Sequence, residues 1–172
     1  MKQINISYHK TKIWEIVLGS FEWKLCLLTF RYKKMRDRVD SRLKRLLNAE
    51  FIEKEDEIIS EAKKQLDSYL LWNIKEFNLP LLLVWTDFQK QVWEWLLKIE
   101  YWKTISYIDL AKNINNKKAF RAVANANWSN AISIIIPCHR VIANSWDLGW
   151  YWGWLDVKEY LLDLEIKNKY WL

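Results

Sequence analysis

The first thirty residues alternate between apolar and polar side chains, which is the period of a β-strand with one buried face. Alternation is clear over residues 4–8, and two longer apolar runs, 13–18 and 24–32, flank a polar interval at Glu22-Trp23. Two such runs separated by a short polar interval are typical of a hairpin. The pattern therefore predicts two or three strands in an antiparallel meander.

Helical spacing replaces this alternation after residue 32. Residues 33–64 are highly charged, and their few apolar side chains recur at helical intervals, as do those of residues 56–71. This spacing predicts two helices, and the acidic run 50–61 is interpreted as a solvated face. Residues 78–84 include Pro80 and are expected to form an extended connector. We therefore expect an N-terminal domain over 1–80 and a C-terminal domain over 85–172.

The second half of the chain begins with a distinct helix-start signal. Thr86-Asp87-Phe88-Gln89 is a capping box, in which the first and last side chains satisfy each other's backbone amides. A second helix is expected to start at Ser106, with Asp109 at its third position. A third, rich in alanine, is expected over 118–127. Two short helices joined by a tight polar turn suggest a helix-turn-helix, although many such pairs bind no nucleic acid.

A β-branched run, 134–136, ends at a proline and is followed directly by Cys138 and His139. β-Branched residues favour strands, and Pro137 has no N–H to donate to a neighbouring strand. The pattern predicts a buried strand that delivers a thiol to a surface. The alternative is that Cys138 is a small buried apolar residue and His139 an ordinary loop residue.

Composition and charge restrict the function classes. The 172 residues include only two cysteines and two histidines, which give neither a disulfide framework nor metal-ligand spacing. No apolar stretch reaches the length of a membrane span. The net charge is +6, and residues 103–140 contain six Lys or Arg but a single Asp, a local field suited to phosphate contacts or simply a solvated helix face. We expect a cytoplasmic protein without metal, cofactor or membrane partner.

Tryptophan is unusually common and glycine unusually rare: the chain has 13 Trp and 3 Gly. Several tryptophans occupy expected turns, where glycine is favoured because it tolerates a positive φ. We hypothesise that all but Trp93 are glycines, written as tryptophan because the host reads UGA as glycine. The alternative is a genuinely tryptophan-rich protein. The twelve positions are Trp14, Trp23, Trp72, Trp85, Trp95, Trp102, Trp128, Trp146, Trp150, Trp152, Trp154 and Trp171.

One motif, supported by residues on both sides of it, resembles the O6-alkylguanine-DNA alkyltransferase family. The match is close over 85–166 and looser over the first 80 residues, and it implies an α+β protein. An N-terminal ribonuclease H-like domain with an antiparallel sheet plus helix would precede a mainly helical, winged-helix-like domain with a helix-turn-helix. The matching elements are Ser106-Tyr107, Arg121-Ala122-Val123, Asn130, Pro137-Cys138-His139-Arg140-Val141, Tyr151 and Glu165. Family glycines correspond to Trp85, Trp102, Trp128, Trp146 and Trp154.

The resemblance implies transfer of an alkyl group from the O6 atom of guanine to Cys138. Such a displacement needs a thiolate, and an ordinary cysteine is only slightly ionised at neutral pH. His139 would activate the thiol and a carboxylate would orient its imidazole. The resemblance assigns that carboxylate to Glu165, whereas the residues alone do not distinguish it from Glu159 or Asp163. Since a thioether does not hydrolyse, each molecule would react once.

The target base lies inside the duplex and has to be flipped out. By resemblance, Arg121 would fill the vacated stack, Tyr107 would donate a proton to the leaving guanine, and Ala122 and Ala126 would allow close approach to the minor groove. Asn130 would bond to the backbone and thiol near the cysteine. Alone, each of these residues fits an ordinary surface, core or turn role. Lys118 is added to the DNA-binding set, and the substrate pocket is assigned to Val141, Tyr151 and Trp152.

The implied partner is double-stranded DNA carrying O6-alkylguanine or O4-alkylthymine, and we expect a monomer. A real indole at Trp152 would fill the pocket, whereas a glycine would leave it open. Two other classes stay under consideration. A non-catalytic sensor of alkyl lesions would share the fold, and a cysteine hydrolase would turn over small esters or amides.

Overall fold

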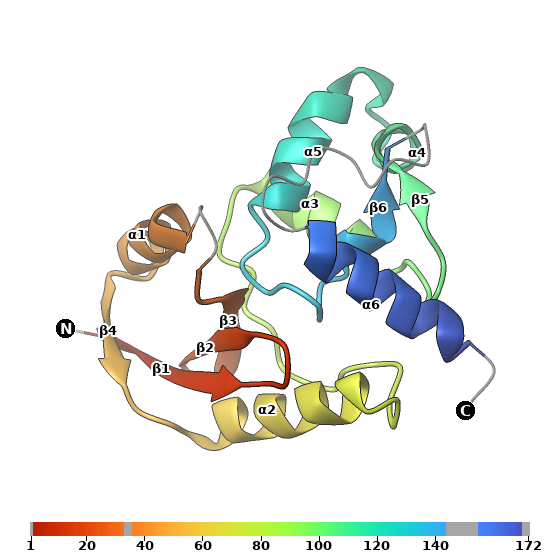
Figure 1. Cartoon of the computed structure of the whole chain (residues 1–172). Helices are drawn as coiled ribbons and strands as arrows, with labels where there is room; N and C mark the ends of the chain where they lie inside the picture. The colour runs from red at the N-terminus through yellow and green to blue at the C-terminus, as the bar shows by residue number, and fades with distance from the viewer. Residues whose placement is uncertain (1, 33–35, 144–154, 170–172) are drawn as a thin grey trace. The chain divides into compact units, whose positions relative to one another are not determined.

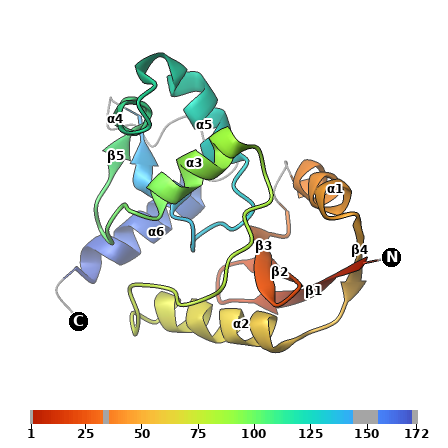
Figure 2. The same cartoon turned by 180° about the vertical axis from the view of Figure 1, so that it is seen from behind.

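The computed structural model describes residues 2–32, 36–143 and 155–169, and these divide into two compact units (Figures 1 and 2). The first unit is Met1–Trp85 with Ala131–Ser133, and the second is Thr86–Asn130 with Ile134–Leu172. Residues 131–133 join the first unit because they bond to β3: Leu28 donates to the Ala131 carbonyl and accepts from the Ser133 amide. The chain therefore returns to its first unit just before the cysteine motif.

The first unit is built on a four-stranded sheet with the order β3-β2-β1-β4. Strands β1 to β3 form the expected antiparallel meander, and Glu22-Trp23 is its hairpin turn, with φ of 46° and 64°. Two successive positive φ values are the signature of a type I′ turn. The strands are β1 (Lys2–Lys10), β2 (Glu15–Phe21), β3 (Lys24–Phe30) and β4 (Ala49–Glu53).

The fourth strand was not predicted, although the glutamates of residues 50–61 are exposed, as expected of a solvated face. β4 pairs with β1 in parallel, from Lys2 opposite Ala49 to Ile6 opposite Glu53, so the sheet is mixed. Its charged residues at 50 and 53 conceal the strand pattern. Helix α1 (Arg36–Leu47) precedes it, and α2 (Glu57–Leu70) follows and runs along the sheet (Figure 1). Both helices agree with the predicted spacing.

The second unit contains the expected short helices. Thr86 accepts from the Gln89 amide at the start of α3, and Ser106 accepts from the Asp109 amide at the start of α4. A turn at Asn115 separates α4 from α5, which gives the helix-turn-helix. The elements are α3 (Asp87–Leu96), β5 (Ile105–Ser106), α4 (Tyr107–Asn113), η1 (Lys117–Ala119), α5 (Phe120–Trp128), η2 (Cys138–Arg140), β6 (Val141–Ile142) and α6 (Leu155–Lys167).

The segment before Cys138 differs from the predicted continuous strand. Ile134 has a φ of 72° and lies in a turn, so the apolar run changes direction. The cysteine then begins the 3-10 helix η2, and only Val141–Ile142 form a strand, parallel to β5. Residues 134–136 are nevertheless buried. The prediction of burial was correct, whereas the prediction of a strand was wrong because the β-branched side chains pack into a turn.

Candidate active site

Cys138 lies at the first position of η2 and is only 5% exposed. Its neighbours His139 and Arg140 are also buried. Buried ionisable groups need partners, since an unpaired charge in a protein interior is costly. All three residues belong to one turn of helix, so their partners decide what the turn can do.

Glu165 of α6 is the common partner of this turn and is fully buried. His139 Nε2 lies 2.7 Å from Glu165 Oε1, and Arg140 Nε donates to both carboxylate oxygens at 3.1 and 3.0 Å. The backbone N–H of Trp102 donates to Oε2 at 2.9 Å. The carboxylate is therefore held from several directions and cannot turn away from the imidazole.

The structure separates Glu165 from the two alternatives that the sequence left open. Glu159 is exposed, and Asp163 is exposed and pairs with Lys167 at 3.4 Å. All three acids lie on α6, but only Glu165 lies on the face that packs against η2. The contact between His139 and Glu165 expected from the family resemblance is thus present, and Cys138 precedes His139 in the same turn.

Burial and charge fix the protonation of the pair. Burial raises the pKa of the Glu165 carboxyl, but the hydrogen bond from His139 and the charges of His139 and Arg140 outweigh this effect. The resulting pKa is about 2, below the usual value of a glutamate. Burial lowers the pKa of His139, and Glu165 opposes that shift only in part. The pair is therefore a carboxylate and a neutral imidazole near pH 7. With Nε2–H donating to Glu165, the lone pair is on Nδ1, which has no hydrogen-bond partner among the described residues.

Two asparagines attach the end of the helix-turn-helix to the cysteine segment. Asn130 Nδ2 donates to the Ile136 carbonyl at 2.9 Å, and Asn127 Nδ2 donates to the Cys138 carbonyl at 3.2 Å. Both side chains are fully buried. The backbone contact expected of Asn130 is present, and its expected bond to the thiol stays a prediction. Asn127 was not singled out from the sequence, because a buried face at the end of a short helix leaves no local signal.

Two further groups interact with the Cys138 side chain electrostatically. Burial raises the pKa of Tyr107, hydrogen bonds with Trp128 and Asn127 oppose this shift, and the negative charge of Cys138 adds to it. Lys158 of α6 is fully buried, and its Nζ donates to the Val141 carbonyl at 2.6 Å. Burial lowers the pKa of Lys158 to about 8, while the Cys138 charge acts in the opposite direction. No pattern in the sequence distinguishes Lys158 from the other lysines.

The expected DNA-contacting residues are distributed unevenly. Lys118, Arg121 and Ala122 are exposed at the start of α5 and just before it, as a binding surface requires. Ala126 is only 2% exposed, and its carbonyl accepts from Trp93 Nε1 at 2.9 Å. Ala126 therefore faces the interior and not the groove. Val123, Ala126 and Asn127 form the buried face of α5, whereas its first residues, 120–122, are exposed.

Of the three residues assigned to the substrate pocket, the structure describes one. Val141 is buried in β6 beside the cysteine turn. Tyr151 and Trp152 lie outside the described residues. Within 2–32, 36–143 and 155–169, no three His, Cys, Asp or Glu side chains gather as a metal site would require. None of the helices in those ranges is long and apolar enough to cross a membrane.

Comparison with known proteins decides the family. A family model described as the DNA-binding domain of 6-O-methylguanine DNA methyltransferase matches residues 87–167. A methylated-DNA–protein-cysteine methyltransferase of Methanosarcina mazei is 39% identical over 163 residues, which are 94% of this chain and 98% of the relative. The chain belongs to this methyltransferase family.

Other members of the family agree over shorter or longer spans. The homologue of Methanosarcina acetivorans is 47% identical over 110 residues, which are 64% of this chain and 70% of that protein. The crystal structure of Mycobacterium tuberculosis OGT in complex with DNA superimposes with a TM-score of 0.80 at 33% identity, covering 96% of this chain and 94% of that one. The methyltransferase family fold thus extends over both units, including the N-terminal one that the sequence matched only loosely.

Proposed function

We propose that this protein repairs DNA by moving an alkyl group from the O6 atom of guanine to its own Cys138. The observation that carries the proposal is the buried chain of contacts from Glu165 through His139 to the turn that begins with Cys138. Family membership supports the same reaction, since the matched relatives are named methylated-DNA–protein-cysteine methyltransferases. The protein would be consumed in the reaction and would act once.

The proton of the thiol has a defined acceptor. His139 Nδ1 carries the lone pair of a neutral imidazole, and it takes the Cys138 proton directly or through one water. The imidazolium that forms is stabilised by Glu165, which stays ionised throughout because its pKa is about 2. Arg140 keeps Glu165 in place but also limits the positive charge that His139 can hold. This division of roles follows the logic of a nucleophile, base and orienting carboxylate.

The alkyl carbon is then transferred from O6 to sulfur in a single displacement step. Cys138 Sγ attacks the carbon, an S–C bond forms, and the C–O6 bond breaks with its electron pair left on the guanine. A proton from the Tyr107 hydroxyl neutralises the leaving base, and hydrogen bonds with Trp128 and Asn127 offset part of the cost of the buried phenolate. The buried ammonium of Lys158 attracts the thiolate before attack, as the mutual charge interaction indicates.

Access to the target atom requires a flipped base, and exposed residues on and before α5 are suited to that task. We assign Arg121 to the vacated stack and Lys118 and Ala122 to the DNA backbone, and the exposure of all three residues supports this assignment. O6-alkylguanine in a duplex is the proposed substrate, and O4-alkylthymine is a second one. A cytoplasmic monomer is part of the same proposal, and it is consistent with the burial of both cysteines.

The decisive variant is Cys138→Ser, tested on a duplex with a single O6-methylguanine. We expect loss of methyl transfer and unchanged affinity for the duplex, because the hydroxyl is a far weaker nucleophile of similar size. Cys26→Ser is the matched control. Cys26 is buried in β3, its pKa is raised to about 12 by burial, and it should be dispensable for transfer.

Other outcomes identify the other function classes. Retained transfer in Cys138→Ser would refute the assignment of the acceptor. Binding of alkylated duplex without transfer by the unaltered protein would indicate a lesion sensor. Repeated turnover of small esters would indicate a cysteine hydrolase.

A further inference from the structure

Three of the tryptophans have a backbone conformation that glycine adopts readily and tryptophan does not. Trp23, Trp72 and Trp102 have φ of 64°, 70° and 61°. In this left-handed region the β-carbon of an L-residue crowds a backbone carbonyl oxygen, and bulky side chains are found there only rarely. The other described residues with positive φ that are not glycine are Glu22, Asn48, Asn115 and Ile134. Asparagine is the other residue type that tolerates this region.

Position 72 occupies the helix-ending site at which glycine is most strongly preferred. The Trp72 N–H bonds to the Tyr69 carbonyl at 3.1 Å, and the Asn73 N–H bonds to the Ser68 carbonyl at 2.8 Å. With α2 ending at Leu70, this pair of bonds is a Schellman motif whose left-handed residue is number 72. The indole itself does not compensate for the strain, since Trp72 is 52% exposed.

Position 23 follows the same rule in a different setting. It is the second central residue of the β2–β3 hairpin, a type I′ turn in which glycine is the preferred residue at this place. Trp23 is 71% exposed, so its ring packs against little. Positions 23 and 72 thus lie in two unrelated turns that require a positive φ, and at both positions the indole is exposed.

Trp93 differs from these three residues because its side chain has a clear structural role. It lies inside α3, is fully buried, and its Nε1 donates to the Ala126 carbonyl at 2.9 Å. Its body fills the core and its one polar atom is satisfied, as expected of a buried tryptophan. The same chain therefore contains a tryptophan that the fold requires and three that the fold strains.

We infer that the protein made by its natural host carries glycine at positions 23, 72 and 102, read from UGA codons, and tryptophan at position 93. The other described candidates do not have a positive φ. They are Trp14, Trp85, Trp95 and Trp128. Position 102 matters most for the reaction, because its left-handed backbone N–H holds Glu165. The inference itself is about residue identity and does not depend on the proposed function.

The direct test is peptide sequencing by mass spectrometry of the protein isolated from its host, together with the codons of its gene. We expect glycine and UGA at the three positions, and tryptophan and UGG at position 93. Tryptophan at all three positions would overturn the inference.

A second measurement uses the protein as written, produced in an ordinary expression host. Trp72→Gly should raise the Tm by about 3–6 °C, whereas Trp72→Ala removes the same indole but keeps a β-carbon, so its gain should be smaller. Trp93→Gly is the opposite control and should lower the Tm sharply. A Trp72→Gly protein that is no more stable than Trp72→Ala would contradict the inference.

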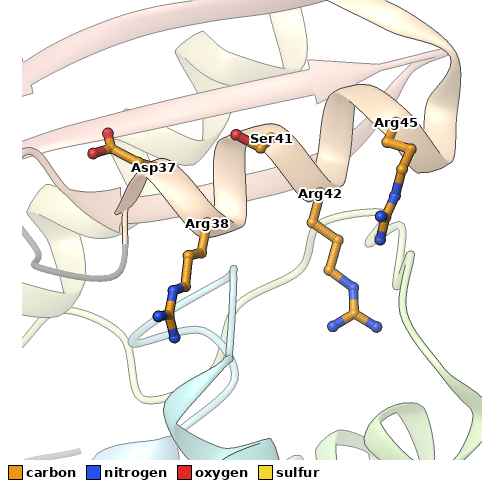
Figure 3. A pocket seen from close by; sticks show the side chains of 5 residues that line it. All are labelled: Asp37, Arg38, Ser41, Arg42 and Arg45. Carbon is orange, nitrogen blue, oxygen red and sulfur yellow. The ribbon is translucent and has the colours of Figure 1, made fainter.

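A separate observation concerns α1 of the first unit. Arg38, Arg42 and Arg45 recur at helical spacing, and together with Asp37 and Ser41 they line one pocket (Figure 3). Their backbone positions rise by about 6 and 4.5 Å along the helix, a spacing comparable to that of successive phosphates. The three arginine side chains extend to the same side of α1, whereas Asp37 points away from them, so the pocket is strongly basic.

The exposed arginines of this pocket differ from the other cations of α1. Arg36 pairs with Asp40 at 2.7 Å and Lys44 pairs with Glu50 at 2.5 Å. Among the described residues, neither Arg38 nor Arg45 forms an ion pair, and both are exposed. Arginine is well suited to phosphate oxygens because its planar group donates two parallel hydrogen bonds. These two exposed arginines are therefore available for an anion outside the chain.

We propose that this face of α1 binds phosphates of DNA, in addition to the contacts made by α5. The proposal rests on the proposed function, since it takes DNA as the partner. Arg38→Gln/Arg45→Gln should reduce the slope of log K against log salt by about 2, because each lost phosphate contact removes roughly 0.9 from that slope. The matched control is Lys24→Gln/Lys64→Gln, which removes two exposed charges elsewhere in the same unit.

The outcomes separate this proposal from the proposed function. Transfer from free O6-benzylguanine should be equal in the double variant, the control and the unaltered protein. A salt slope in the Arg38→Gln/Arg45→Gln protein equal to that of the control would overturn the α1 proposal alone. Failure of the unaltered protein to take up the methyl group of an O6-methylguanine duplex would instead refute the proposed function.

Discussion

Two glutamates in different regions have carboxyl groups with the same lowered pKa but in opposite surroundings. Glu55, between β4 and α2, has a pKa of about 2 because Lys63 and Ser60 bond to it, and its side chain is 44% exposed. Glu165 also has a pKa of about 2, yet it is fully buried between His139 and Arg140. The Glu55 carboxylate keeps much of its hydration in the folded protein, whereas the Glu165 carboxylate loses nearly all of it.

This difference shows that a lowered pKa does not by itself measure how much a carboxylate matters. An exposed pair is screened by water and contributes at most about 1 kcal/mol. A buried pair is costly to assemble, and removing one partner leaves an uncompensated charge that costs about 3–5 kcal/mol. The first unit places its charges on the surface of a sheet with an apolar core, while the second buries a charged cluster beside its thiol.

The largest expected effect comes from removing each carboxylate in turn. Glu165→Gln should lower the free energy of unfolding by about 3–5 kcal/mol and abolish rapid methyl transfer, because Arg140 stays buried without its partner. Glu55→Gln should lower it by less than about 1 kcal/mol and leave transfer unchanged. Urea unfolding and a single-turnover assay measure both. Equal losses of stability would contradict the comparison.

The two histidines extend the comparison to catalysis, since each one lies beside a carboxylate. His139→Asn should slow methyl transfer about 10²–10⁴-fold with duplex affinity retained, because the general base is lost. His9→Asn removes the ring that lies 2.8 Å from Asp67 in the first unit, and it should not affect transfer. Single-turnover rates on methylated duplex give the result. A similar slowing in both variants would argue against a specific role for His139.

Acid should reveal the buried carboxylate as a loss of stability. The folded pKa of Glu165 is about 2, below its usual value, so its contribution is complete above about pH 5 and disappears as the pH falls toward 2. The stability difference between the unaltered protein and Glu165→Gln should therefore shrink by about 3 kcal/mol over that range. Urea unfolding at several pH values measures it, and a difference that stays constant would contradict the assigned pKa.

Lys158 offers a smaller and pH-dependent effect. Lys158→Met should slow transfer about tenfold at pH 7, because a buried ammonium no longer attracts the thiolate, and the defect should narrow above the Lys158 pKa of about 8. Lys167→Met, on the exposed side of the same helix, is the control and should have no effect. A defect of constant size from pH 7 to 9 would indicate a packing role instead.

Arg121 should give the smallest effect on chemistry, since it lies on the surface. Arg121→Ala should weaken repair of duplex about tenfold and leave reaction with free O6-benzylguanine unchanged, because only the duplex substrate needs a flipped base. Competition between the two substrates measures both at once. Equal losses on both would remove Arg121 from the flipping role.

Features encoded by neighbouring residues were predictable from the sequence. The Glu22-Trp23 turn and the helix starts at Thr86 and Ser106 depend on side chains within a few residues, and all three are present. β4 was missed because parallel pairing joins residues far apart in the chain, and because acidic side chains interrupt its apolar positions. The prediction of a strand before Cys138 was wrong because the backbone turns at Ile134. Isoleucine is a residue type typical of strands, so its identity does not indicate such a turn.

The candidate site was predictable only in part, because some of its contacts join residues that are far apart in the chain. Cys138 and His139 stand together in one motif, and family resemblance added Glu165. The choice among three acids on α6 depended on which face packs against η2, a tertiary property. Lys158 and Asn127 act through burial and distant carbonyls, so no spacing along the chain points to them.

The most direct test of the central claim is the intact mass of the protein after incubation with excess O6-methylguanine duplex, followed by peptide mapping. The account predicts that each molecule gains one methyl group, located on Cys138, and that no further repair occurs. A methyl group on Cys26, or repair of several lesions by each molecule, would contradict a single-use acceptor activated by His139 and Glu165.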